Sequence, residues 1–170
     1  MTVNEHIREF HGLPVFDFVE AVEQEEATAG SLPGAGAVAW KIGLDFESEG
    51  TFAERWQRFL DTVDVERVSA LVLGQWFSEA PEGLEEEALT AIVASAHRLP
   101  ALRALFVGDI TYEESEISWL EMCDVTPLLT AFPRLTELVV RGGTDLALKP
   151  VRHDALTALR FEAGGLPAEV

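Results

Sequence analysis

Four segments of the chain repeat one pattern, in which an apolar residue is followed by leucine three positions later and by another apolar residue two positions after that. The segments are residues 68–73 (VSALVL), 102–107 (LRALFV), 135–140 (LTELVV) and 156–161 (LTALRF). Their first residues lie 34, 33 and 21 positions apart. Leucine-rich repeats have this strand pattern and a period of about 20–29 residues. The two longer spacings leave room for a longer helix between strands.

The residues between these segments have the marks of helices. Residues 81–99 place apolar side chains at helical spacing, put glutamates in the first turn and end at Pro100. A second helix is predicted from Thr126, with Thr126 as its N-cap and Pro127 at its first position, and it ends before Pro133. Residues 142–154 are too few for a long helix and predict a turn or a short 3₁₀ piece.

The N-terminal part follows the same alternation less regularly. Residues 37–46 (AVAWKIGLDF) alternate as a strand does, and residues 14–18 (PVFDF) predict an edge strand. Residues 40–42 lie 31 positions before residues 71–73, which makes them a divergent first repeat. Thr51 and Glu54 form a capping box at the start of a helix. The apolar stripe of that helix is Phe52, Trp56, Phe59, Leu60 and Val63. Residues 20–36 are acidic and then rich in Ala, Gly and Pro, and predict a loop.

These elements predict an α/β fold that resembles a leucine-rich-repeat solenoid. Its curved parallel sheet forms the concave side, its helices lie on the convex side, and its N-terminal repeat is irregular. We expect one domain over residues 1–170, with a divergent part at 1–66 and recognisable repeats at 67–170.

The residues between the inward leucines are expected on the concave side. One row across the strands holds Lys41, Val72, Phe106, Val139 and Arg160, and the next holds Gly43, Gly74, Gly108, Arg141 and Glu162. Exposed Val72, Phe106 and Val139 would make an apolar patch. The predicted partner-binding residues are Arg103, Phe106, Val139, Arg141 and Arg160, with Asp109 and Glu113 on the rim. Two alternatives stay open: another segment, such as residues 20–36, covers the patch, or the register slips and these residues are core.

Charge and composition narrow the classes of partner. The chain has 12 Lys and Arg against 30 Asp and Glu, a formal net charge of −18, which disfavours nucleic acid and anionic membranes. An acidic surface either attracts a basic partner or only maintains solubility. One cysteine, no signal-peptide pattern and no apolar run of about 18 residues predict a cytoplasmic protein.

Candidate chemistry is sparse. The four histidines have no paired spacing and there is no cysteine cluster, so neither a metal site nor a cofactor is predicted. No Gly-x-Ser-x-Gly motif or phosphate-binding glycine motif occurs. The favoured function is a non-enzymatic scaffold that binds a protein or peptide on its concave sheet. The alternative is an accessory subunit or a metal-dependent enzyme that uses the acidic loop at residues 109–116.

Several short motifs carry a family resemblance over nearly the whole chain. They are residues 11–14 (HGLP), 74–76 (GQW), 108–112 (GDITY) with 116–119 (EISW), 124–127 (DVTP), 141–143 (RGG) and 164–167 (GGLP). With them the chain resembles a family of uncharacterised bacterial leucine-rich-repeat proteins with ribonuclease-inhibitor-like architecture. The resemblance implies a cytoplasmic repeat scaffold and no established activity. Chains of this kind continue with further repeats. Because an open parallel edge invites pairing, we expect the strand at residues 156–161 to promote homodimers.

Overall fold

The computed structural model describes residues 3–23, 32–44, 50–76, 84–115, 120–168 and 170. Strands and helices alternate along the middle of the chain. The strands are β1 (Glu9–Phe10), β2 (Leu13–Asp17), β3 (Ala39–Ile42), β4 (Ala70–Leu73), β5 (Ala104–Val107), β6 (Glu137–Arg141) and β7 (Ala158–Glu162). The helices are α1 (Phe18–Glu23), α2 (Phe52–Thr62), η1 (Val65–Arg67), α3 (Leu84–Ala94), η2 (Ala96–Arg98) and α4 (Thr126–Ala131).

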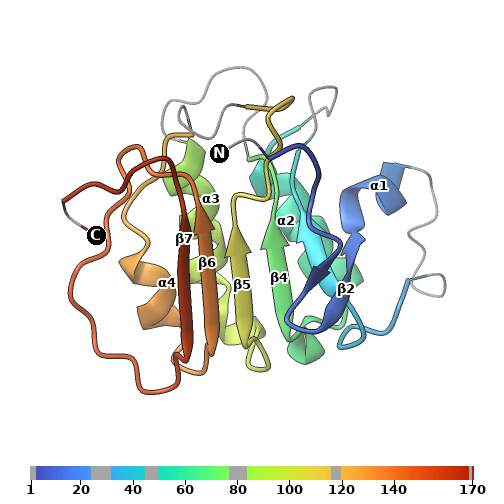
Figure 1. Ribbon diagram of the computed structural model, residues 1–170. Coiled ribbons are helices and arrows are strands. Elements are labelled where there is room, and N and C mark those ends of the chain that lie inside the picture. Colours follow the sequence, from blue (N-terminus) through green and yellow to red (C-terminus); the bar gives the residue numbers. More distant parts are fainter. Residues whose placement is uncertain (1–2, 24–31, 45–49, 77–83, 116–119, 169) are drawn as a thin grey trace.

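The seven strands form one curled, mostly parallel sheet in the order of the sequence (Figure 1). Neighbours from β2 to β7 pair in parallel, and β1 pairs antiparallel with β2. The register is the one that the repeated pattern predicts, because Trp40 lies opposite Leu71, Leu71 opposite Leu105, and Leu138 opposite Leu159. The row of residues predicted on the concave side is confirmed as well, because each member lies opposite the next: Lys41, Val72, Phe106, Val139 and Arg160.

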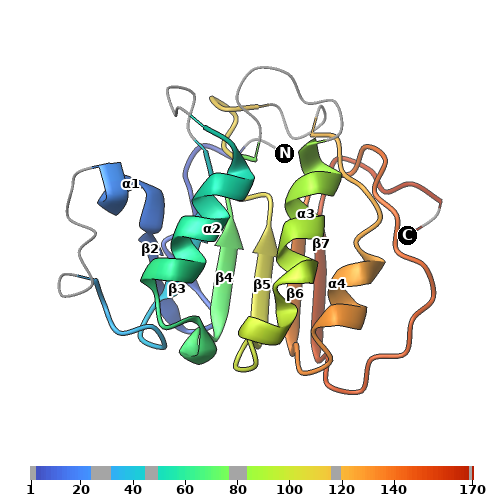
Figure 2. The ribbon, with the colours of Figure 1, turned by 180° about the vertical axis from the view of Figure 1, so that it is seen from behind.

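The convex face of the sheet is covered by helices. Figure 2 shows α2, α3 and α4 side by side against the strands. Leu71, Leu105 and Leu138 belong to one buried cluster with the apolar stripe of α2 and with the inner faces of α3 and α4. The capping box is present, since Thr51 accepts a hydrogen bond from the Glu54 main-chain N–H and the Glu54 carboxylate accepts one from the Thr51 N–H.

Two local predictions need correction. Residues 20–23 belong to α1, because Asp17 accepts hydrogen bonds from the Val19 and Glu20 N–H groups and so caps this helix, while residues 24–31 lie outside the described part. Thr126 is the first residue of α4 and its N-cap position is held by Val125, with the Thr126 N–H bonded to Asp124.

The prediction of a turn within residues 142–154 is confirmed, with the turn at Asp145. This segment also pairs with the loop before α4 at the bridges Glu121–Thr144 and Asp124–Ala147.

Strand β7 is the last strand of the sheet as described. Leu159 is 43% exposed, although its neighbour in the same row, Leu138, is fully buried. The expected homodimer through this edge stays a prediction. Within the described residues, no helix combines the length and hydrophobicity needed to cross a membrane.

The capping box gives a direct test of α2. We expect Thr51→Ala to lower the free energy of unfolding by about 1 kcal/mol, because the Glu54 N–H loses its acceptor at the helix N-terminus. Urea unfolding of the purified chain measures it. The matched control is Thr90→Ala on the exposed side of α3, where the same substitution improves helix propensity. Equal losses in both variants would contradict the assigned cap.

Candidate functional site

The concave face of the sheet is covered by the N-terminal segment of the same chain. We call residues 3–12 the N-terminal strap; in Figure 1 it runs in front of the strands. Phe10 on the strap is buried and meets the Phe106 ring edge to face, with centroids 5.7 Å apart. Phe10 belongs to a second buried cluster with Val72, Phe106 and Val139, against which Ile7 also packs.

The predicted apolar patch is therefore not exposed. Val72, Phe106 and Val139 do point to the concave side, as expected, but each is at most 2% accessible. The first alternative, cover by another segment of the chain, is the correct one, and the strap supplies this cover through Ile7 and Phe10. Residues 24–31 of the segment first considered lie outside the described part. Burying apolar rows on both faces of the sheet is what a parallel sheet requires.

Two histidines fasten the strap, one near each edge of the sheet. His6 lies at the carboxyl edge, where its Nδ1 is 3.1 Å from an Asp109 carboxylate oxygen, and the Ile7 N–H donates to the other oxygen. His11 lies at the amino edge, where its Nδ1 is 2.8 Å from a Glu137 carboxylate oxygen. The strap thus crosses the concave face from the end of β5 to the start of β6.

Asp109 joins the strap to the sheet. Its side chain is fully buried, two residues after β5, and accepts a hydrogen bond from Arg141 on β6 at 3.2 Å. Arg141 also donates to Glu162 on β7 at 2.9 Å, and its guanidinium lies 4.9 Å from the centre of the Phe106 ring. Lys41 on β3 lies 4.0 Å from the same carboxylate. A carboxylate so deeply buried needs these partners, because desolvation without them is costly.

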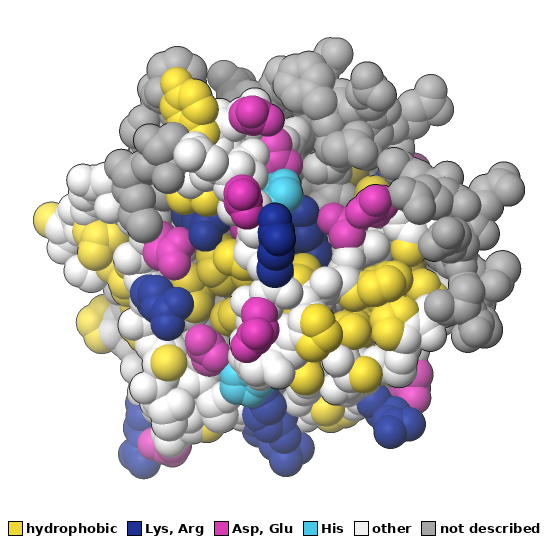
Figure 3. All heavy atoms as spheres, turned by 45° about the vertical axis from the view of Figure 1, so that its right-hand side comes forward, with side chains coloured by type: hydrophobic (Ala, Val, Ile, Leu, Met, Phe, Trp, Pro, Cys, Tyr) yellow, Lys and Arg dark blue, Asp and Glu magenta, His cyan; other side chains and the backbone are white. Residues whose placement is uncertain are grey.

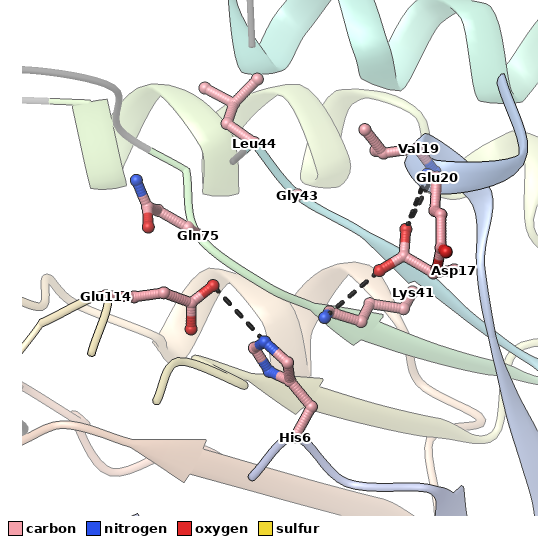
Figure 4. A pocket seen from close by; sticks show the side chains of 9 residues that line it. All are labelled: His6, Asp17, Val19, Glu20, Lys41, Gly43, Leu44, Gln75 and Glu114. Atoms are coloured by element: carbon pink, nitrogen blue, oxygen red, sulfur yellow. Dashed lines mark hydrogen bonds and ion pairs between the residues drawn. The ribbon is translucent and has the colours of Figure 1, made fainter. Parts of the chain in front are cut away.

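A cavity of about 270 Å³ opens beside this cluster, at the carboxyl ends of β2, β3 and β4. Figure 4 shows Lys41 between Asp17 and His6, with Glu114 on the far side of His6. The ammonium of Lys41 is 3.2 Å from Asp17, and Nε2 of His6 is 3.5 Å from Glu114. The lining residues come from the strap, β2, α1, β3 and the loops after β3, β4 and β5: His6, Asp17, Val19, Glu20, Lys41, Gly43, Leu44, Gln75 and Glu114.

We call this cavity the rim pocket. Its charge distribution follows from the Lys41–Asp17 and His6–Glu114 ion pairs. Hydrogen bonds to Asp109 and then to Glu114 raise the pKa of His6 to about 9 against the opposing effect of burial, so His6 is a cation at neutral pH. Burial opposes ionisation of Glu114, but hydrogen bonds from His6 and from Thr111 outweigh it and lower the pKa of Glu114. Two cations and three acidic side chains therefore line the pocket, and Figure 3 shows both charges gathered around a histidine on this face.

The predicted partner-binding residues do not form one accessible surface. Phe106, Val139, Asp109 and Arg141 are buried beneath the strap or within the ion-pair cluster. Arg103 is half-buried and donates to the Pro100 and Leu102 carbonyl oxygens. The exposed members are Glu113, in the turn after β5, and Arg160 on β7. Their role in binding a partner stays a prediction.

No local pattern in the sequence indicates that His6, Asp17 and Lys41 belong to one site. Spacing between histidines does not reveal the role of His6, because its partner Asp109 lies 103 positions away. A usable signal was the composition of the strands. Residues 70–73 (ALVL) and 104–107 (ALFV) are apolar at every position, which is typical of strands that are buried on both faces.

Comparisons with known proteins support the fold and identify no family. No protein-family model matches the chain, and no curated protein matches it. A crystal structure of a Bacteroides fragilis protein, solved as a Northeast Structural Genomics Consortium target, superposes with a TM-score of 0.67 at 25% sequence identity. The alignment covers 89% of this chain and 43% of the Bacteroides chain. This chain therefore matches less than half the length of its structural neighbour.

The rim pocket offers ion pairs more readily than metal ligands. Across the described ranges, no group of three His, Cys, Asp or Glu side chains is placed to hold a metal ion. Asp109 is engaged by Arg141 and His6, and Glu114 by His6 and Thr111. The arrangement is suited to holding a polar group of a ligand through carboxylate oxygens and fixed cations.

Removing the charge of Asp109 tests whether this carboxylate joins the strap to the sheet. We expect Asp109→Asn to lower the free energy of unfolding by about 3 kcal/mol, because Arg141 and His6 lose a shared, buried partner. Chemical denaturation of both chains measures the difference. Asp154→Asn, which breaks an exposed pair with Arg152, is the control and should cost less than about 1 kcal/mol. Similar losses in the two variants would contradict the assignment.

The raised pKa of His6 predicts a pH dependence. The pKa is about 9 in the folded chain and near 6.5 when unfolded, so protonated His6 stabilises the fold fully below about pH 6.5. That contribution is lost as the pH rises through 9. Unfolding measured from pH 6 to 10 should show the loss in the wild type and a flatter profile in His6→Gln. Parallel profiles for the two chains would count against the His6–Asp109 pair.

Proposed function

We propose that this protein is a non-enzymatic scaffold of leucine-rich-repeat type that binds a protein or peptide on the concave side of its sheet. The sequential strand order supports the repeat assignment, as do the register of the repeated leucines and the position of α2, α3 and α4 side by side on one face. In such solenoids each repeat contacts its neighbours and the curved sheet presents an extended binding surface.

One observation carries the binding role: the rim pocket is open at the carboxyl ends of the strands, and segments far apart in the chain converge on it. A cavity of about 270 Å³ has room for one side chain of a partner. The partner's neighbouring residues would then lie along the concave rim towards Arg160 on β7.

The contacts that we propose lie away from the apolar centre of the concave face. With Phe106 and Val139 covered, the accessible residues on this side are His6, Asp17, Lys41 and Glu114 in the pocket and Arg160 on β7. The metal-dependent enzyme is not favoured by any feature of the described residues, since Asp109 and Glu114 in the acidic loop are held in ion pairs and hydrogen bonds. We therefore retain binding as the function.

Affinity recovery from native cell extract tests the proposal. The pocket variant is Asp17→Asn/Glu114→Gln, which keeps side-chain shape and removes two charges at the pocket. We expect it to recover at least ten-fold less of the partner that the wild type recovers, because the carboxylates that hold the partner are gone. The immobilised chains are first checked for equal folded fraction by circular dichroism.

The matched control is Glu66→Gln/Asp154→Asn, which removes two charges from exposed positions outside the pocket. It should recover the partner as the wild type does. Equal recovery by the pocket variant would contradict the assigned site. If the wild type recovers no partner, the scaffold function itself loses its support.

A further inference from the structure

We propose that the N-terminal strap occupies a peptide-binding site on the concave face. The partner that binds there is an extended segment of the same chemistry as the strap, in which cationic side chains flank an aromatic residue. This inference rests on the proposed binding function and goes beyond it by naming the ligand class and its competitor within the chain.

The concave face presents a row of small side chains next to a row of larger ones. Three small residues in adjacent strands, Ala39, Ala70 and Ala104, are aligned in one row and are fully buried. The row continues to Glu137 on β6, whose carboxylate pairs with His11. The larger side chains of Val72 and Phe106 form the next row of this face. Phe10 of the strap belongs to the same buried cluster as both rows.

The strap is bound as a ligand would be. It is not a strand of the parallel ladder: its β1 pairs only with β2 among the described strands, over Glu9 and Phe10. Besides its side-chain contacts, the carbonyl oxygens of Val3 and Arg8 accept hydrogen bonds from the Tyr112 and Val15 N–H groups. Its outward residues are exposed: Asn4, Glu5, Arg8 and Glu9. Terminal segments open at lower free energy than the core of a fold.

The turn that follows the strap marks where the strap separates from the sheet. His11 and Gly12 connect β1 to β2 with φ angles of 53° and 71°, the positive angles typical of a two-residue hairpin turn. Opening of the strap breaks this hairpin and leaves β2 paired with β3.

The charges on the face define the partner. The carboxylates of Asp109 and Glu114 hold His6 near the carboxyl edge, and Glu137 holds His11 near the amino edge. An arginine or lysine at the same positions would place a fixed cation against these carboxylates. The net charge of −18 also steers a basic segment towards this protein. The favoured partner is therefore an extended basic segment with a central phenylalanine or similar ring.

Competition with the strap sets the affinity. The partner reaches the face only in molecules whose strap is open, so the apparent dissociation constant equals the intrinsic one divided by the open fraction. Any substitution that opens the strap ten-fold more often, without altering the face, must therefore tighten binding ten-fold.

Fluorescence anisotropy on the full chain tests this relation. The probe is a labelled peptide with the sequence of residues 3–13 (VNEHIREFHGL). We expect Phe10→Ala, which removes the strap's aromatic anchor, to bind the probe at least ten-fold more tightly than the wild type does. Hydrogen exchange of residues 3–10 should accelerate by the same factor. A second variant, His6→Gln/His11→Gln, opens the strap by a different route and leaves Phe10 in place.

The probe carries its own controls. A peptide with alanine at the position of Phe10 should fail to bind, and one with lysine at the two histidine positions should bind more tightly. The proposal is overturned if the probe binds neither variant, if it binds the wild type equally well, or if neither variant accelerates exchange of the strap. These results leave partner recovery through the rim pocket unaffected, so failure of this inference and failure of the proposed function are distinguishable.

Discussion

Both faces of the sheet carry apolar side chains, and each face must be kept from water. Parallel sheets satisfy this requirement with cover on both sides. Here α2, α3 and α4 cover the convex face, and the strap covers the concave face. The placement of the strap, the burial of the predicted patch and the position of the open pocket all follow from this constraint.

A buried carboxylate holds the strap on the concave face. Asp109 receives the Arg141 guanidinium from the sheet and both His6 and the Ile7 N–H from the strap, so one side chain satisfies groups from two layers. Beside this point lies the rim pocket at the carboxyl edge, and the remaining charges of the cluster, Lys41 and Glu114, line it as partly buried side chains.

Local sequence patterns determine most of the sheet and little of the site. The repeated leucines predicted the register of five strands, because a parallel sheet aligns equivalent residues of successive repeats. Thr51 and Glu54 predicted the start of α2 through contacts within one helical turn. The strap could not be placed this way. His6 and Phe10 meet Asp109 and Phe106 across about a hundred positions, and no period relates them. The apolar runs at residues 70–73 and 104–107 indicated that a cover exists without indicating which segment provides it.

A double-mutant cycle on Phe10 and Phe106 tests most directly whether the strap lies on the concave face. Phe10→Leu, Phe106→Leu and the double variant keep apolar volume while removing one ring or both, and urea unfolding gives the free energy of each. The edge-to-face contact predicts a coupling free energy of about 1 kcal/mol between the two positions. Additive effects, within about 0.3 kcal/mol, would contradict the account, because residues that do not touch show no coupling.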